Sequence, residues 1–110
     1  MLRNQACVPC EVGAPTATEE EIKGYLGELS GWEVVEEEGM KRIKKVFKFK
    51  DFKEAVKFTD KVAARAEEHG HHPRLVLEWG KVEVWWWTHK IKGLHRNDFV
   101  MAAKTEEDYL

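Results

Sequence analysis

The sequence has few cysteines, no long apolar run and no block of like charge, and each shortage excludes a class of protein. The 18 basic and 20 acidic residues are mixed along the chain, which argues against a surface built to bind phosphate backbones or anionic membranes. The apolar stretches are only as long as strands, too short to span a bilayer. We therefore expect no nucleic-acid partner and no membrane association.

The segment Met1–Cys10 also lacks the apolar core and the small-residue cleavage site of a signal peptide, so we expect a cytoplasmic protein. The 110 residues are 43% hydrophobic and 35% charged, which suits one compact domain with a single core. We divide the chain into a flexible leader, residues 1–17, and a single domain, residues 18–110.

The two cysteines, Cys7 and Cys10, form a C-x-x-C pair in this leader. A zinc ribbon needs a second such pair, and a thioredoxin-like site needs the pair to open a helix, whereas Pro9 and Pro15 favour extended chain. We interpret the leader as mobile and without a catalytic role. A metal shared between subunits and a redox pair are the open alternatives.

The first half of the domain predicts a helix followed by a hairpin. Thr18 and Glu21 have the spacing of a capping box, and apolar residues follow at helical spacing, so we expect a helix over residues 18–29. Alternating apolar residues on both sides of a glycine-containing turn then predict strands at 32–36 and 42–49.

The second half predicts a long helix, a second hairpin and a last helix. An apolar stripe favours a helix that Asp51 caps at its start and Gly70 ends in the left-handed conformation. Strands are expected at 75–79 and 81–90, and the last helix begins near Asp98.

This order of elements, helix-strand-strand-helix-strand-strand-helix, predicts an α+β fold. Short connections favour antiparallel pairing, and amphipathic helices need an apolar sheet face to cover. We therefore expect a four-stranded antiparallel sheet with three helices packed on one face. Strand alternation places Trp85, Trp87 and His89 on one side of the last strand and Trp86 on the other, and we expect at least one tryptophan to line a pocket or a subunit contact.

Histidines are the candidate chemical groups. His71 and His72 lie at a helix-to-strand junction, and His89 ends the tryptophan-rich strand. Imidazole has an ordinary pKa of about 6.5 and donates or accepts protons near neutrality, so such a cluster can supply both an acid and a base. Solvated surface histidines are the plainer alternative. Zinc is a further rival, although no H-E-x-x-H motif is present and adjacent side chains tend to point apart.

A longer pattern runs through these histidines. Its members are Glu67, His71-His72-Pro73, Trp79, Thr88-His89 and Asp98. The pattern resembles the signature of the pterin-4a-carbinolamine dehydratases, and the resemblance extends over roughly residues 18–103. One departure is His95, where relatives often have serine or threonine, because histidine is a weaker helix cap.

The resemblance implies an enzyme that dehydrates 4a-hydroxytetrahydrobiopterin to quinonoid dihydropterin in tetrahydrobiopterin recycling. It implies a pterin as the small-molecule partner, no cofactor and no metal. Family members are commonly dimers or tetramers, so we expect a homodimer or homotetramer. The alternative is a non-enzymatic dimerisation, coactivator or assembly module on the same fold.

The resemblance also assigns roles to individual residues. The catalytic histidines would be His71, His72 and His89, with His71 and His89 as acid and base and His72 orienting the pterin. Substrate-binding or orienting roles would fall to Glu67, Trp32, Pro73 and Asp98. Within this set, Glu67 is expected to hold the imidazole of His71, Trp32 to stack on the pterin ring, and Asp98 to orient the site from a helix N-terminus, where an anion is stabilised.

Overall fold

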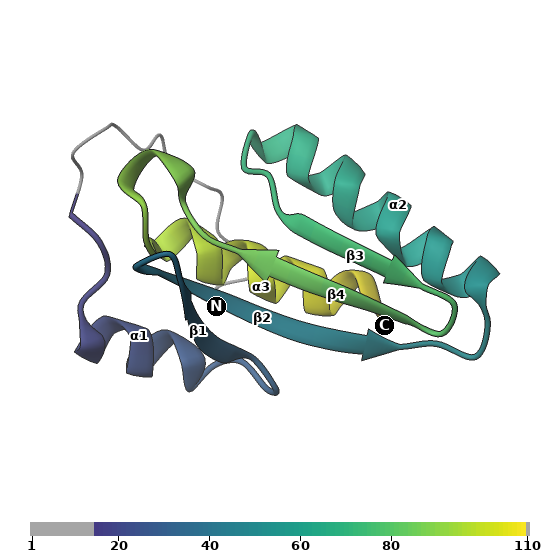
Figure 1. Ribbon diagram of the computed structural model, residues 1–110, viewed down its shortest axis with the longest axis horizontal. Coiled ribbons are helices and arrows are strands. Elements are labelled where there is room, and N and C mark those ends of the chain that lie inside the picture. The colour runs from purple at the N-terminus through teal and green to yellow at the C-terminus, as the bar shows by residue number, and fades with distance from the viewer. Residues whose placement is uncertain (1–14, 110) are drawn as a thin grey trace.

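The computed structural model describes residues 15–109, which form three helices and one four-stranded antiparallel sheet (Figure 1). The helices are α1 (Glu19–Leu26), α2 (Phe52–His69) and α3 (Arg96–Tyr109). The strands are β1 (Glu33–Glu37), β2 (Met40–Lys48), β3 (Arg74–Glu78) and β4 (Lys81–Trp86), and a 3₁₀ turn, η2 (His89–Ile91), follows β4. The predicted α+β class and the order of helices and strands are confirmed.

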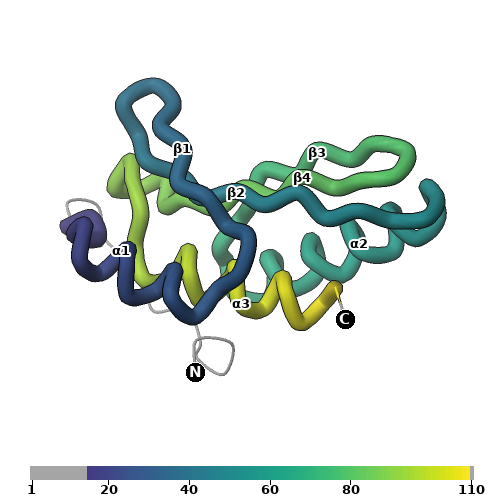
Figure 2. The backbone as a smooth tube through the Cα atoms, turned by 90° about the horizontal axis from the view of Figure 1, so that it is seen from below, coloured from purple at the N-terminus to yellow at the C-terminus, as the bar shows by residue number. Residues whose placement is uncertain are grey.

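The two hairpins join through their inner strands, giving the sheet order β1-β2-β4-β3. Ile43 on β2 lies opposite Trp86 on β4, and Lys44 lies opposite Trp85, so these two rows face opposite sides of the sheet. Figure 2 shows the helices on one side of the sheet and the β1–β2 hairpin bending away from them. No helix within residues 15–109 is long and apolar enough to cross a membrane.

The core lies between the sheet and the helices. On the sheet side, Ile43 and Phe47 of β2 and alternate residues of β4 from Val82 to Trp86 are fully buried on the face toward the helices. Large, fully buried core side chains include Ile43, Phe47, Val82, Val84 and Trp86 from the sheet, with Val62, Phe99 and Met101 from the helices. The core therefore places α2 and the start of α3 against the end of β4.

The helix ends follow the local sequence signals. Thr18 and Glu21 form the predicted capping box, and the Asp51 side chain accepts from the Glu54 N–H at 2.9 Å. Gly70 ends α2 in the left-handed region at φ 64°. Helix α1 is shorter than predicted because it ends at Leu26 and Gly27 serves as its C-cap.

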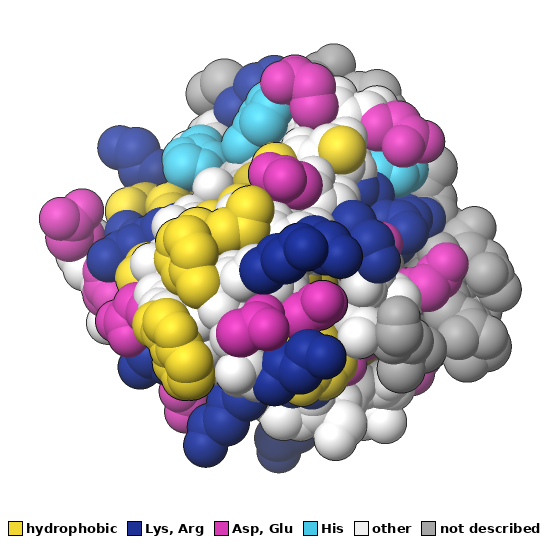
Figure 3. All heavy atoms as spheres, turned by 90° about the vertical axis from the view of Figure 1, so that its right-hand side faces the viewer, with side chains coloured by type: hydrophobic (Ala, Val, Ile, Leu, Met, Phe, Trp, Pro, Cys, Tyr) yellow, Lys and Arg dark blue, Asp and Glu magenta, His cyan; other side chains and the backbone are white. Residues whose placement is uncertain are grey.

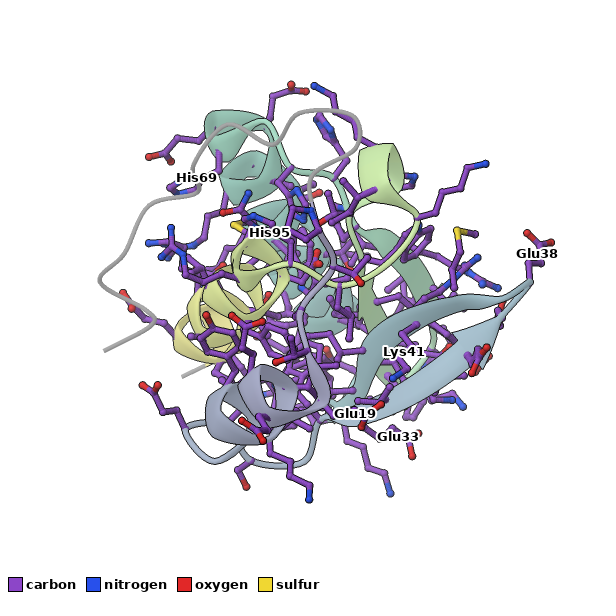
Figure 4. All side chains as sticks on the ribbon, turned by 90° about the vertical axis from the view of Figure 1, so that its left-hand side faces the viewer. Glu19, Glu33, Glu38, Lys41, His69 and His95 are labelled. Carbon is purple, nitrogen blue, oxygen red and sulfur yellow. The ribbon has the colours of Figure 1, made fainter. Side chains whose placement is uncertain are left out.

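One ion pair joins α2 to α3, and another joins α1 to β2. The Arg65 guanidinium on α2 donates to both carboxylate oxygens of Asp108 near the end of α3, and this hydrogen bonding raises the pKa of Arg65. Lys41 on β2 pairs with Glu19 on α1, and the two side chains lie side by side in Figure 4. The hydrogen bond from Lys41 lowers the pKa of Glu19.

The three consecutive tryptophans are all buried, but they do not share one core. Trp86 faces the helices, whereas Trp85 and Trp87 lie on the opposite face of the sheet. Cationic side chains cover these two outer indoles, with the Arg42 guanidinium 4.1 Å from the centre of the Trp87 ring and Lys44 beside Trp85.

Strand β4 is shorter than predicted. It ends at Trp86, and the chain turns at Thr88, which pairs with Gly93 in an isolated bridge. The turn is closed by Lys92 in the left-handed region at φ 54°. His89 consequently begins a 3₁₀ turn and does not end a strand.

Candidate active site

The carboxylate of Asp98 is the centre of the candidate site. It is fully buried, and one of its oxygens lies 2.6 Å from Nε2 of His71. The other oxygen accepts hydrogen bonds from the Thr88 hydroxyl and the His95 backbone N–H, both at 2.9 Å. Asp98 therefore joins the α2–β3 junction, the end of β4 and the start of α3.

His71 is held in one orientation by this carboxylate and by an indole. Its side chain is 11% exposed, and its ring stacks on Trp86 with 5.8 Å between centroids and 8° between planes. Trp86 is itself fixed by a 3.1 Å hydrogen bond from its Nε1 to the Thr105 hydroxyl. Because a carboxylate only accepts, Nε2 of His71 carries the hydrogen of this bond, and Nδ1 has no hydrogen-bond partner among residues 15–109.

His72 lies in a different environment from its neighbour. Its side chain is 60% exposed, and its Nε2 lies 3.4 Å from the carboxylate of Glu67, which is 82% exposed. The two histidines diverge because residues 71–73 form an irregular junction before β3, where Pro73 restricts the backbone. Glu67 thus faces His72, and the carboxylate that holds His71 is Asp98, contrary to the predicted pairing.

His89 lies exposed at the start of η2, directly after Thr88. Its ring is tilted against Trp87, with 4.6 Å between centroids and 37° between planes. The Thr88 hydroxyl binds the same carboxylate as His71, so Asp98 links the segments that carry both histidines. Figure 3 shows histidine side chains reaching the surface on the end of the molecule that it displays.

His95 caps α3 despite its departure from the family pattern. Its Nδ1 accepts a hydrogen bond from the Asn97 N–H at 3.1 Å, while Asp98 accepts from the His95 N–H. The bond to Asp98 is that of a capping box, whereas the imidazole accepts from the second residue of the helix in place of the third. Figure 4 shows His95 beside the start of this helix. The cap therefore keeps Asp98 in place at the helix N-terminus, where its negative charge is favoured.

Trp32 is not brought to the histidines by the contacts of its side chain. Its indole is 7% exposed, packs edge-on against Phe47 and donates to the carboxylate of Glu106 at 2.9 Å. Glu106 and Asp98 are eight residues apart on α3, or about 12 Å along the helix axis. Stacking of Trp32 on a pterin stays a prediction.

The sequence analysis assigned no function to two side chains that contact the site, Thr88 and Trp86. Thr88 belongs to the motif, but the hydrogen bond from its hydroxyl to Asp98 depends on the turn after β4. Trp86 packs against His71 from the sheet. Motif membership was a signal for Thr88, whose hydroxyl can donate to a carboxylate, while nothing local signalled Trp86.

Among residues 15–109, no group of three His, Cys, Asp or Glu side chains is placed to hold a metal ion. Cys7 and Cys10 lie outside the described residues, so the structure does not bear on their predicted roles.

A family model and individual relatives identify the same family for this chain. The family model described as pterin 4 alpha carbinolamine dehydratase matches residues 15–107. A protein of Saccharophagus degradans is 56% identical over 98% of this chain and 96% of its own length. A protein of Chlorobium limicola is 57% identical over 94% of this chain and 92% of its own. Both are named as candidate pterin-4-alpha-carbinolamine dehydratases.

Solved structures agree with this result. A transcriptional coactivator/pterin dehydratase from Brucella melitensis superposes with a TM-score of 0.80 at 34% identity, covering 87% of this chain and all of that one. A pterin dehydratase-like RuBisCO assembly factor of the alpha-carboxysome has the same fold, with a TM-score of 0.63 at 21% identity over 74% of this chain and 92% of its own. This chain belongs to the pterin 4 alpha carbinolamine dehydratase family.

Proposed function

We propose that the protein is a pterin-4a-carbinolamine dehydratase that converts 4a-hydroxytetrahydrobiopterin into quinonoid dihydropterin and water, as in tetrahydrobiopterin recycling. The observation that carries the proposal is the His71 imidazole, whose Nε2 binds the buried Asp98 and whose Nδ1 has no hydrogen-bond partner in the part of the chain that the structure describes. Such a pairing fixes the tautomer and the direction of the ring, as proton transfer requires. Membership of the family supports the choice of substrate class.

The reaction requires two proton transfers and no change of oxidation state. The bond between C4a and its hydroxyl oxygen breaks as an acid protonates that oxygen, which leaves as water. A base removes the proton from the adjacent ring nitrogen, and the electron pair forms the new carbon–nitrogen double bond. His71 and His89 supply the acid and the base, and solvent returns the proton from one to the other.

The remaining predicted residues bind and orient in this proposal. His72 and Glu67 are exposed and contact one another, so they are free to engage the edge of a flat ring from solvent. Pro73 restricts the backbone that separates them from β3. Asp98 does not transfer a proton to the substrate, and it holds His71 in the reactive orientation.

The proposal is tested by stopped-flow ultraviolet absorbance of 4a-hydroxytetrahydropterin decay. Wild type should accelerate the decay over the uncatalysed rate, and His71→Ala and His89→Ala should each lose on the order of a hundredfold or more while staying folded. His69→Ala is the matched control, because His69 ends the same helix outside the motif, and it should keep the wild-type rate. Unchanged turnover in both motif variants would refute the assignment.

A second candidate function is suggested by the Brucella melitensis relative, which is named a transcriptional coactivator as well as a pterin dehydratase. Such a role, like the predicted homodimer or homotetramer, needs surface for protein contact. Phe52, Trp79 and Val46 expose 46%, 69% and 40% of their surface, and Figure 3 shows hydrophobic side chains gathered on one side of that end of the molecule. Light scattering would give the number of subunits. A wild-type protein that binds a protein partner but does not accelerate dehydration would favour the second function.

A further inference from the structure

Arg42 on β2 is a buried cation that hydrogen bonding does not explain. The residue is 6% exposed, and its Nε is buried without a hydrogen-bond acceptor among the described residues. Its nearest carboxylate, on Glu37, lies 3.7 Å from Nη1 and remains partly exposed. A poorly paired buried charge is costly, so the guanidinium has no evident benefit for stability.

The principal contact of this guanidinium is the indole of Trp87, 4.1 Å from its Cζ to the ring centre. The same indole contacts the imidazole of His89 at 4.6 Å. Arg42, Trp87 and His89 thus form one row of contacting planar groups on the face of the sheet away from the helices, with the imidazole tilted by 37° against the indole. This row connects β2 to one of the histidines of the candidate site.

We propose that Arg42 is a positioning residue for His89, acting through Trp87. His89 begins an exposed 3₁₀ turn, and no carboxylate among residues 15–109 holds its side chain as Asp98 holds that of His71. Attraction between a desolvated guanidinium and an indole face fixes the plane of the indole, and this plane limits the rotation of the imidazole against it. The inference rests on the proposed function, in which His89 transfers a proton.

The same strand provides an internal comparison. Lys44, two residues from Arg42 on the same face, lies 5.0 Å from the ring centre of Trp85. Trp85 is as buried as Trp87 but contacts no histidine ring among the described residues. Removing the cation of Lys44 from Trp85 should therefore leave the orientation of the histidine rings unchanged. Removing the cation of Arg42 from Trp87 should change the orientation of the His89 ring.

The test compares Arg42→Met with Lys44→Met in three measurements. The first is the NMR chemical shift of the His89 ring protons, which the nearby indole displaces through its ring current. The second is how far the substitution changes kcat and how far it changes KM in the dehydration assay. The third is thermal stability, because methionine in place of a poorly paired buried arginine should keep the fold as stable or make it more stable.

We expect Arg42→Met to shift the His89 ring protons toward solvent values and to lower kcat about tenfold with KM within about twofold, at wild-type stability or above. Lys44→Met should match wild type in the first two measurements. An unchanged His89 spectrum in Arg42→Met would overturn the inference, and so would a parallel loss of stability and rate. Wild type without dehydratase activity would refute the proposed function, while the spectrum would still report whether Arg42 orders His89.

Discussion

His71 and His72 are consecutive residues in the sequence, yet their side chains occupy opposite environments. His71 is nearly buried, stacked on Trp86 and tied to a buried carboxylate, whereas His72 is exposed and lies 3.4 Å from an exposed one. The family resemblance gives the two histidines different roles, and the structure gives them different surroundings. The difference shows that the network around Asp98 orients the imidazole of His71 and leaves that of His72 exposed, and under the proposed function this makes His71 the one of the two that transfers a proton.

The largest effect should separate these two histidines. His71→Ala removes an oriented imidazole and should slow dehydration on the order of a hundredfold or more, while His72→Ala, whose place water can take, should cost about tenfold. Stopped-flow rate constants for both variants give the ratio. Equal losses would contradict the distinction drawn from their burial.

Asp98→Asn should cause the next largest loss of dehydration rate, because the amide keeps the shape of the side chain but loses its negative charge. An amide can donate to Nε2 of His71 and so favour the wrong tautomer, and we expect kcat to fall about tenfold. Asp108→Asn, at the other end of α3, is the matched control. It removes the charge that pairs with Arg65 and should lower stability while leaving kcat unchanged.

Thr88→Val tests whether the hydroxyl supports the carboxylate. The substitution keeps the branched shape but removes a 2.9 Å hydrogen bond to the buried Asp98, which should cost about 1–3 kcal/mol of unfolding free energy. Urea denaturation measures this loss. An unchanged midpoint would mean that the His95 N–H satisfies that oxygen alone.

Glu67→Gln should have the smallest effect. The contact between Glu67 and His72 is exposed and long, and such surface pairs contribute little to stability. We expect wild-type stability and a kcat within about twofold of wild type, with the loss of pterin binding by Glu67 confined to a higher KM, measured by thermal unfolding and the dehydration assay. A loss of kcat as large as that of Asp98→Asn would contradict this expectation and show that the exposed pair supports the reaction.

Local signals in the sequence were sufficient for most of the fold. The capping box of Thr18, the Asp51 cap and the left-handed Gly70 each depend on residues within one turn, and each is present in the structure. Motif spacing predicted a site around His71, and its residue roles stay predictions. The tie between His71 and Asp98 did not, because it depends on α3 returning to the end of β4.

The sequence alone does not predict features that depend on strand order and register. The pairing of β2 with β4 decides that Arg42 and Lys44 meet the indoles of Trp87 and Trp85, and nothing near those tryptophans predicts it. The end of β4 was placed too late because Trp87 and Thr88 have strong strand propensity, and the bridge between Thr88 and Gly93 overrides it.

The most direct test of a proton-transferring His71 held by Asp98 is a double-mutant cycle in the dehydration rate. Wild type, His71→Ala, Asp98→Asn and the double variant are compared under identical conditions. If Asp98 acts through His71, the double variant should be no slower than His71→Ala alone. Additive losses in the double variant would contradict this coupling and give Asp98 an independent role.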